Sequence, residues 1–354
     1  MVEQFFADPI LLALAGVIAG LCISVFGFAG VTLHLRVKNN RTARHWGGLE
    51  EKWDPLILQA LHEDLPLQRV WQSVDATHAL YFVGYLVRYV RRLSGAEREV
   101  IQRLADPYLP KIAHHILVGD ETQRARSVQT LGEFSLAKYA ATIQETLDDP
   151  STFVAMAAAR ALVRSGRPEL ADAVLQELDR FEHWRPQFLS AMLASAGQGA
   201  APALRATFVD RSRKPRTRSI AGRALALLLD GESAGLAAEI VATNADPFVL
   251  ASALEILERA GGPEYVAPVR AMVSSCNAIV RGAAASALGS IGEQRDAATL
   301  LVVARHDPSP WVAIRAARAL RRLGLGGPEL RALASSDDER STLALQVLTE
   351  EGGR

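Results

Sequence analysis

Cysteine is almost absent from this sequence, which holds only Cys22 and Cys276 among its 354 residues. Two isolated cysteines exclude a disulfide framework and any zinc or redox site built on a Cys-x-x-Cys pair. Aromatic residues are also scarce, at 6% of the chain, and runs of β-branched residues are few, whereas Ala and Leu are abundant. This balance favours helices over sheets.

An excess of either charge is missing as well, because 39 Lys and Arg residues stand against 39 Asp and Glu residues. A protein that coats nucleic acid is expected to be clearly basic. The neutral balance therefore argues against nucleic acid as the main partner. A length of 354 residues leaves room for about two domains or for one extended array.

Sequence motifs of known chemistry are missing too, including the Walker, HExxH and EF-hand patterns. The segment 289–292 (GSIG) fits the end of a helix better than a nucleophile elbow, and the segment 324–327 (GLGG) lacks the later glycine of a dinucleotide-binding loop. We expect Cys276 to be a small buried residue. The sequence thus predicts no catalytic residue, no cofactor and no metal site, and it is interpreted as that of a non-enzyme.

A long segment without charge runs from Ile10 to Leu33 and contains 24 residues. About 20 apolar residues suffice to span a bilayer, and the Leu, Ile, Val and Phe residues here supply roughly −6 kcal/mol of insertion free energy. The preceding residues contain no Lys or Arg, unlike the start of a signal peptide. We therefore expect residues 1–35 to be a transmembrane anchor. Basic residues that follow it set the topology, with the N-terminus outside and the bulk of the chain inside: Arg36, Lys38, Arg41 and Arg44.

Small residues recur within this apolar segment at spacings of 3, 4, 4 and 3, which places them on one helix face: Ala13, Gly16, Gly20, Ser24 and Gly27. Such a face allows close packing against another transmembrane helix, either from a second copy or from a different protein. The alternative is that glycine is simply common in membrane helices.

Residues 36–118 are expected to form a polar juxtamembrane linker over 36–48, followed by irregular helices. Trp53 is predicted to lie in the core of the first of these. The helical candidates are 49–61, 75–93, 95–105 and 108–117.

The rest of the chain, residues 119–354, is periodic. Aligned on a recurring apolar residue near a helix end, the spacings are 30, 33, 32, 31 and 32, for Leu162, Met192, Leu225, Leu257, Leu288 and Leu320. Extrapolation to Leu131 and Leu348 gives about seven or eight units, each of which predicts two helices. The predicted fold is all-α, with a right-handed α-solenoid after the anchor.

Each unit repeats the same order of residue types. Several open with Asp-Pro, which suits a helix start, as at 149–150, 246–247 and 307–308. An apolar residue, a small residue and the recurring Leu follow on one helix face. A glycine four residues after the Leu predicts a left-handed helix end: Gly166, Gly261, Gly292 and Gly324.

The unit Asp-Pro-x-x-x-Val-x-x-x-Ala-x-x-Ala-Leu-x-x-x-Gly resembles the HEAT-like repeat of the phycobilisome-lyase type, over about two-thirds of the chain. The layout, with one N-terminal span, a Trp-x-Pro-like helix at 52–56 and then repeats, resembles a group of bacterial membrane-anchored HEAT-repeat proteins. That resemblance implies a scaffold in the bacterial inner membrane. Its N-terminus is then periplasmic, and its cytoplasmic solenoid binds a protein partner, such as a polysaccharide-synthesising glycosyltransferase of an exopolysaccharide system or its regulator.

The resemblance also leaves an enzymatic alternative, a HEAT-like lyase or modifying enzyme. Metal hydroxylases of that superfamily use His-Glu pairs on repeat helices. The single His-Glu pair here, at 62–63, lies outside the repeats.

One loop of the repeat region is strongly basic, with five cations within 211–218: Arg211, Arg213, Lys214, Arg216 and Arg218. A solvated loop explains it without any ligand. As a functional site it is interpreted as a contact for an acidic protein surface or for anionic lipid. A nucleic-acid-binding solenoid is a further alternative.

Overall fold

The computed structural model describes residues 9–62, 64–243, 246–324, 327–335 and 341–349. Within these ranges, side chains are described except at 9–19, 34–35, 37–43, 329 and 333. The chain divides into two compact units, Met1–Tyr108 and Leu109–Arg354. All regular elements of the described part are helices, as the composition predicts.

The first unit is built on one long helix and three short ones, α2 (Pro9–Leu61), α3 (Leu67–Gln72), α4 (Ala79–Val90) and α5 (Gly95–Ala105). The prediction that Trp53 lies in the core is confirmed, because its side chain is 1% exposed and meets Phe82 edge to face. Asp54 faces α4 and accepts hydrogen bonds from the hydroxyl groups of Tyr85 and Tyr89.

Residues 36–48, which were expected to form a polar linker, are part of α2, which continues through them without a break. Gly47 and Gly48 would by themselves weaken the helix. Contacts of the residues on either side of this glycine pair stabilise it. Trp46 stacks on Tyr81 with 3.8 Å between ring centroids, and the Tyr81 hydroxyl donates to Glu50 at 2.6 Å. Contacts with α4 therefore hold both flanks of the glycine pair in the helix.

The apolar segment lies at the start of α2. Among the residues that the structure describes, no helix has both the length and the apolar character needed to cross a membrane. Ala13 and Gly16 fall outside the described side chains, as do Lys38 and Arg41, whereas Arg36 and Arg44 are exposed. Gly20, Ser24 and Gly27 are exposed too, and so are the large apolar residues between and beyond them: Leu21, Ile23, Val25, Phe26, Phe28, Val31 and Leu33.

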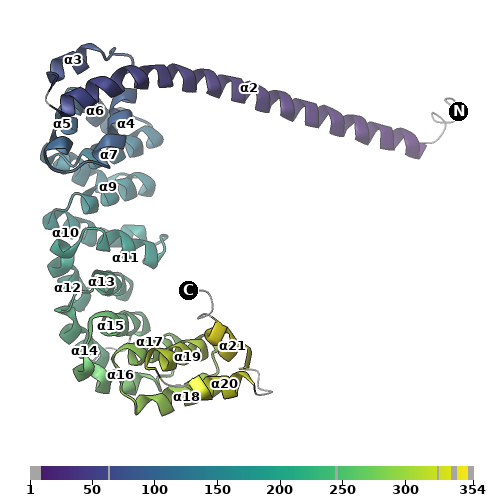
Figure 1. Cartoon of the computed structure of the whole chain (residues 1–354), viewed down its shortest axis with the longest axis vertical. Helices are drawn as coiled ribbons and strands as arrows, with labels where there is room; N and C mark the ends of the chain where they lie inside the picture. The colour runs from purple at the N-terminus through teal and green to yellow at the C-terminus, as the bar shows by residue number, and fades with distance from the viewer. Residues whose placement is uncertain (1–8, 63, 244–245, 325–326, 336–340, 350–354) are drawn as a thin grey trace. The chain divides into compact units, whose positions relative to one another are not determined.

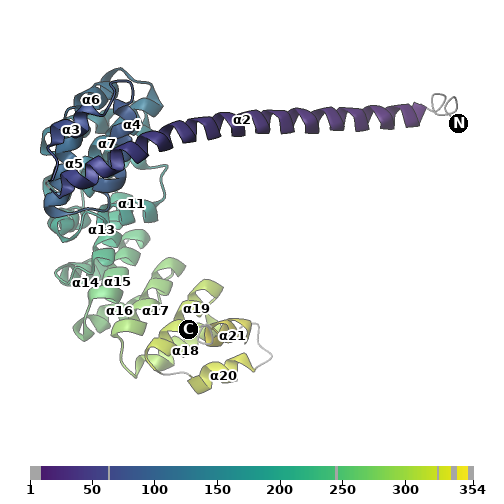
Figure 2. The same ribbon diagram turned by 45° about the horizontal axis from the view of Figure 1, so that its top comes forward.

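The second unit begins with α6 (Leu109–Val118) and then forms two layers of helices, which can be followed in Figure 1 and, from another side, in Figure 2. The inner layer comprises α7 (Glu121–Phe134), α9 (Thr152–Arg164), α11 (Pro186–Ala194), α13 (Pro215–Leu228), α15 (Pro247–Ala260), α17 (Ala278–Ile291), α19 (Pro310–Arg322) and α21 (Ser341–Thr349). The outer layer comprises α8 (Ala140–Glu145), α10 (Pro168–Gln176), α12 (Ala201–Val209), α14 (Ser233–Thr243), α16 (Val266–Met272), α18 (Asp296–His306) and α20 (Gly327–Ala334). Short 3-10 turns precede or follow some of them: η1 (Ala137–Tyr139), η2 (Thr146–Asp148), η3 (Leu178–Phe181), η4 (Gln198–Ala200) and η5 (Pro263–Tyr265).

The periodic residues form the core of this unit, as the repeat predicts. The recurring apolar residues from Leu131 to Leu320 are all buried, and so are the valine and alanine positions of the same helix face. Successive inner helices pack on one another, for example α13 on α15, α15 on α17 and α17 on α19. Each repeat therefore buries its apolar face against its neighbours, which is how a solenoid is stabilised. In the last unit Val347 is buried in place of the expected Leu348.

Small residues let these helices approach closely. Gly289 follows the recurring Leu288 and lies against Ala319 of the next inner helix, where an added Cβ would be 2.6 Å from the Ala319 Cα. Gly132 lies against Ala161 in the same way. The repeat thus pairs a glycine on one helix with an alanine on the next.

We expect Gly289→Ala to lower the free energy of unfolding by about 1–3 kcal/mol, because the new methyl group meets backbone that cannot move aside. Gly84→Ala is the matched control, since Gly84 lies in the middle of α4 with nothing within 4 Å of an added Cβ. That control is expected to be neutral or to stabilise by up to about 1 kcal/mol. Urea unfolding followed by circular dichroism measures both, and equal effects would contradict the close approach.

The glycines after the recurring Leu end their helices in two ways. Gly166 and Gly324 are left-handed, with φ of 72° and 70°, as predicted. For Gly261 and Gly292 the prediction is wrong, because their φ values are −82° and −73°. Glycine is needed there for space instead, since an added Cβ would lie within 2.6 Å of the preceding Leu carbonyl oxygen at both positions.

The aspartates of the Asp-Pro pairs also divide into two kinds. Asp246 caps α15 by accepting the N–H groups of Phe248 and Val249, as predicted. Asp149 and Asp307 instead bind an arginine of the preceding inner helix through both carboxylate oxygens. We call these two pairs, Arg124–Asp149 and Arg281–Asp307, the arginine clamps.

The clamps are charge-assisted hydrogen bonds between partly buried side chains. Arg124 Nε lies 2.8 Å from Asp149 Oδ2, and the same carboxylate accepts the Ser151 N–H at 2.8 Å. Burial by itself raises the pKa of the Asp149 carboxyl, but the bonds from Arg124 and Ser151 outweigh it and hold the pKa below its usual value. Each clamp thus ties the loop before one inner helix to the inner helix that precedes it in the chain.

Candidate functional site

The basic loop 211–218 is largely engaged with its own chain. Lys214 Nζ lies 2.9 Å from the Asp179 carboxylate, and Arg216 donates to the carbonyl oxygen of Glu182 at 2.9 Å. Arg213 approaches Asp210 at 3.7 Å, and Arg211 is exposed.

Arg218 is not available as a surface contact, because its side chain is 5% exposed and its Nε donates to the Phe208 carbonyl oxygen at 3.0 Å. Its interpretation as a partner contact is therefore wrong. Arg218 stands seven residues before the recurring Leu225, which is the position that Arg124 and Arg281 occupy in their own repeats. Within the run of basic residues at 211–218, the structural role of Arg218 could not be recognised from its charge.

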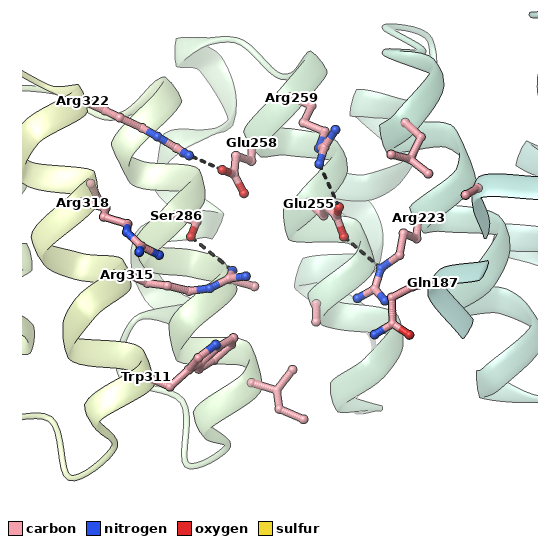
Figure 3. A pocket seen from close by; sticks show the side chains of 16 residues that line it. Gln187, Arg223, Glu255, Glu258, Arg259, Ser286, Trp311, Arg315, Arg318 and Arg322 are labelled. Carbon is pink, nitrogen blue, oxygen red and sulfur yellow. Dashed lines mark hydrogen bonds and ion pairs between the residues drawn. The ribbon is translucent and has the colours of Figure 1, made fainter. Parts of the chain in front are cut away.

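A groove of about 600 Å³ opens on the inner layer, along α11, α13, α15, α17 and α19. Figure 3 shows it from close by. Its polar and charged lining consists of Gln187, Arg223, Glu255, Glu258, Arg259, Ser286, Arg315, Arg318 and Arg322, and Trp311 lies at one side. We call this the arginine groove.

The groove exists because α17 presents small residues between neighbours that carry long ones. Ala283 and Ser286 form its floor on α17. On α19, Trp311, Arg315, Arg318 and Arg322 follow one another at spacings of four, three and four residues. That spacing puts all four on one face of the helix, and this face forms one wall.

The two carboxylates of the groove are shared among its arginines. Glu255 accepts from Arg223 at 3.1 Å and from Arg259 at 3.4 Å. Glu258 accepts from Arg322 at 2.6 Å, a contact that joins α15 to α19 across the floor. Five arginines and two glutamates leave an excess of three positive charges in the groove of a neutral chain.

Arg315 is held by neutral groups. Its Nη1 donates to the Ser286 hydroxyl at 3.2 Å, and its guanidinium lies 4.5 Å from the centroid of the Trp311 ring. Among the described residues no carboxylate lies within ion-pair distance of it. Burial lowers the pKa of the Arg315 guanidinium below its usual value, which reflects partial loss of hydration.

Trp311 is fixed in place by a glycine of the neighbouring helix. An added Cβ on Gly282 would lie 2.2 Å from the edge of the indole ring, so the ring rests directly on the α17 backbone. The side chain is nevertheless 44% exposed. A rigid aromatic surface with an arginine stacked on it therefore borders the groove.

Residues 234–321 and 272–349 match the family model of HEAT repeats. The segment 234–349 is built of HEAT repeats. Among solved structures, human deoxyhypusine hydroxylase in complex with glycerol is 18% identical, with 79% of this chain and 98% of that chain covered and a TM-score of 0.32. Kap121p bound to Ste12p is 13% identical, with 83% of this chain and 43% of that chain covered and a TM-score of 0.35. Neither likeness carries over a function at such TM-scores, and none of the curated proteins matches the sequence.

The repeat register contains a signal for the groove that the sequence interpretation did not use. The position two residues before the recurring Leu faces the groove in four successive repeats, and it holds Arg223, Glu255, Ser286 and Arg318. A charged residue two positions before the recurring Leu, rather than charge in the loops, therefore indicates the surface that forms the arginine groove.

Cys276 and the residue types that bind metal ions can also be located in the structure. Cys276 is exposed, so the expectation that it is buried is wrong. In the ranges for which the structure gives side chains, no three His, Cys, Asp or Glu residues are placed to hold a metal ion together.

Proposed function

We propose that this protein is a non-enzymatic scaffold whose HEAT repeats bind a protein partner in the arginine groove. The observation that carries the proposal is the local charge, since the groove is lined by five arginines and two glutamates in a chain that is neutral as a whole. Repeat solenoids present extended concave surfaces on which several repeats each contribute contacts. Arginine and tryptophan are enriched among the residues that dominate protein interfaces.

We also propose that the uncharged segment Ile10–Leu33 anchors the scaffold in the bacterial inner membrane, with the N-terminus periplasmic and the repeats cytoplasmic. Exposed apolar residues of α2 support it, because Leu21, Ile23, Phe26 and Phe28 lie on different sides of the helix. A helix that is apolar all round suits a lipid environment. Arg36 and Arg44, which follow at the cytoplasmic end, fit this orientation.

The family resemblance suggests the class of partner, a membrane glycosyltransferase that synthesises a polysaccharide, or a regulator of such an enzyme. The small residues of the apolar segment suit packing against a membrane helix of that partner or of a second copy.

Crosslinking in cells, followed by purification in mild detergent, tests the scaffold. We expect the wild-type chain to retain a membrane protein that Arg315→Glu loses, because the substitution places a negative charge at the centre of the groove. Arg211→Glu is the matched control, as it reverses an exposed arginine of the basic loop. Loss of the partner with the loop variant but not the groove variant would move the contact to the loop, and recovery of the protein alone would rule out the scaffold.

A further inference from the structure

We infer that the arginine groove selects an acidic segment of its partner, with at least two carboxylates and one apolar side chain, laid across α17. The inference rests on the proposed scaffold function and specifies the chemistry of what the groove binds. Its grounds are the unequal charges of the groove, the surroundings of Arg315 and the apolar residues at the rim.

The charges leave room for carboxylates from outside. Glu255 already forms ion pairs with two guanidinium groups, and Glu258 forms one with Arg322. Arg315 has a hydroxyl group and an aromatic ring as its partners in the groove. An arriving carboxylate therefore gains more at Arg315 than at an arginine that is already paired.

The setting of Arg315 is suited to a carboxylate. The guanidinium offers several N–H groups in one plane, which matches both oxygens of a carboxylate. A cation that has lost part of its water is unfavourable unless it is paired. Stacking on Trp311 and the bond to Ser286 fix its orientation before a ligand arrives, so less ordering remains to be done on binding.

The rim adds a requirement for an apolar side chain. Leu227, Ile279 and Trp311 line the groove and remain between 38% and 44% exposed. The small residues of α17 at the floor of the groove leave space for the side chains of a bound segment. A segment that carries only charge leaves these apolar surfaces in water, and a purely apolar segment brings no carboxylate to Arg315.

Photo-crosslinking in cells identifies the occupant. We would replace Ile279 or Leu227, one at a time, by p-benzoylphenylalanine in the full-length chain. Val302 on the outer-layer helix α18 is the matched control, as an exposed aliphatic residue away from the groove. The expected result is a crosslinked peptide from another protein, with two or more Asp or Glu residues within about ten positions of the crosslink, at the groove positions and not at Val302.

A titration then tests the role of Arg315. The captured segment, made as a fluorescent peptide, is added to the full-length protein in detergent. We expect Arg315→Gln to weaken binding at least about tenfold, as for a central interface arginine, and Arg211→Gln to leave it unchanged. Replacing the acidic residues of the peptide by Asn and Gln is expected to have the same effect as Arg315→Gln. Circular dichroism of each variant confirms that the fold is intact.

The outcomes separate the two proposals. A captured segment without acidic residues, a crosslink to nucleic acid or lipid, or a peptide affinity unchanged by Arg315→Gln overturns this inference. Capture of a protein at Val302 but not at Ile279 or Leu227 overturns this inference and moves the partner contact from the groove to another face, while a scaffold that binds a protein would still stand. Failure to capture any protein at all three positions overturns both.

Discussion

Replacing Arg281 by Met is expected to lower the free energy of unfolding by about 3–5 kcal/mol, because it removes the guanidinium that binds both oxygens of a buried carboxylate. Arg281 Nε lies 2.7 Å from Asp307 Oδ2, and Nη2 lies 3.0 Å from Oδ1. The Asp307 side chain is 4% exposed, so water cannot replace the lost partner. Arg281 also donates to the Ser275 carbonyl oxygen at 2.9 Å, which ties the loop before α17 to the loop before α19.

The matched control for this clamp is Arg295→Met. Arg295 also pairs with a carboxylate, that of Glu293, but both side chains are largely exposed. Exposed pairs contribute about 0–1 kcal/mol, so this variant is expected to unfold almost like the wild type. Urea denaturation followed by circular dichroism, together with hydrogen exchange of α17–α19, measures both. A loss below about 1 kcal/mol for Arg281→Met would show that the clamp is replaceable.

A second substitution distinguishes the loss of the charge interaction between Arg281 and Asp307 from the loss of packing. Asp307→Asn keeps an oxygen to accept the Ser309 N–H, which Asp307 binds at 2.8 Å, but removes the charge. Combined with Arg281→Met, it is therefore expected to recover part of the lost stability. If the double variant is no more stable than Arg281→Met alone, the stability lost on replacing Arg281 comes from packing and not from the charge of Asp307.

Introducing two arginines into the apolar segment, as Leu21→Arg with Val25→Arg, is expected to release the protein from the membrane. Each arginine near the middle of a span costs about 2.5–3.5 kcal/mol, and together they cancel the roughly −6 kcal/mol estimated for the segment. The measurement is the share of protein in the membrane pellet after an alkaline carbonate wash. Leu21→Ile with Val25→Leu is the control and is expected to stay in the pellet. Wild-type protein in the soluble fraction, or a double arginine variant that stays in the pellet, would refute the anchor.

Much of the repeat architecture follows from sequence because it depends on local periodicity. Leu257, Leu288 and Leu320 are buried where the register places them, since a helix face with apolar residues at these spacings must be covered. The helix that continues through Gly47 and Gly48 could not be predicted, because side chains on α4 hold it together.

The arginine groove was harder to predict for a related reason. Its shape depends on α17 having small residues where α15 and α19 have long ones, and that difference becomes visible only when the helices are stacked. Arg218 and Arg281 illustrate the same limit, since an arginine in one repeat is explained by a carbonyl or a carboxylate contributed by another segment.

The ion pair between Glu258 and Arg322 has a consequence for how the array unfolds. In a repeat protein each unit normally contacts only its neighbours, so cooperativity decays along the array. This pair joins residues 64 positions apart, from α15 directly to α19. It gives the units on either side of α17 a direct link, so we expect α15, α17 and α19 to exchange their amide protons more nearly together than helices that are joined through their neighbours alone.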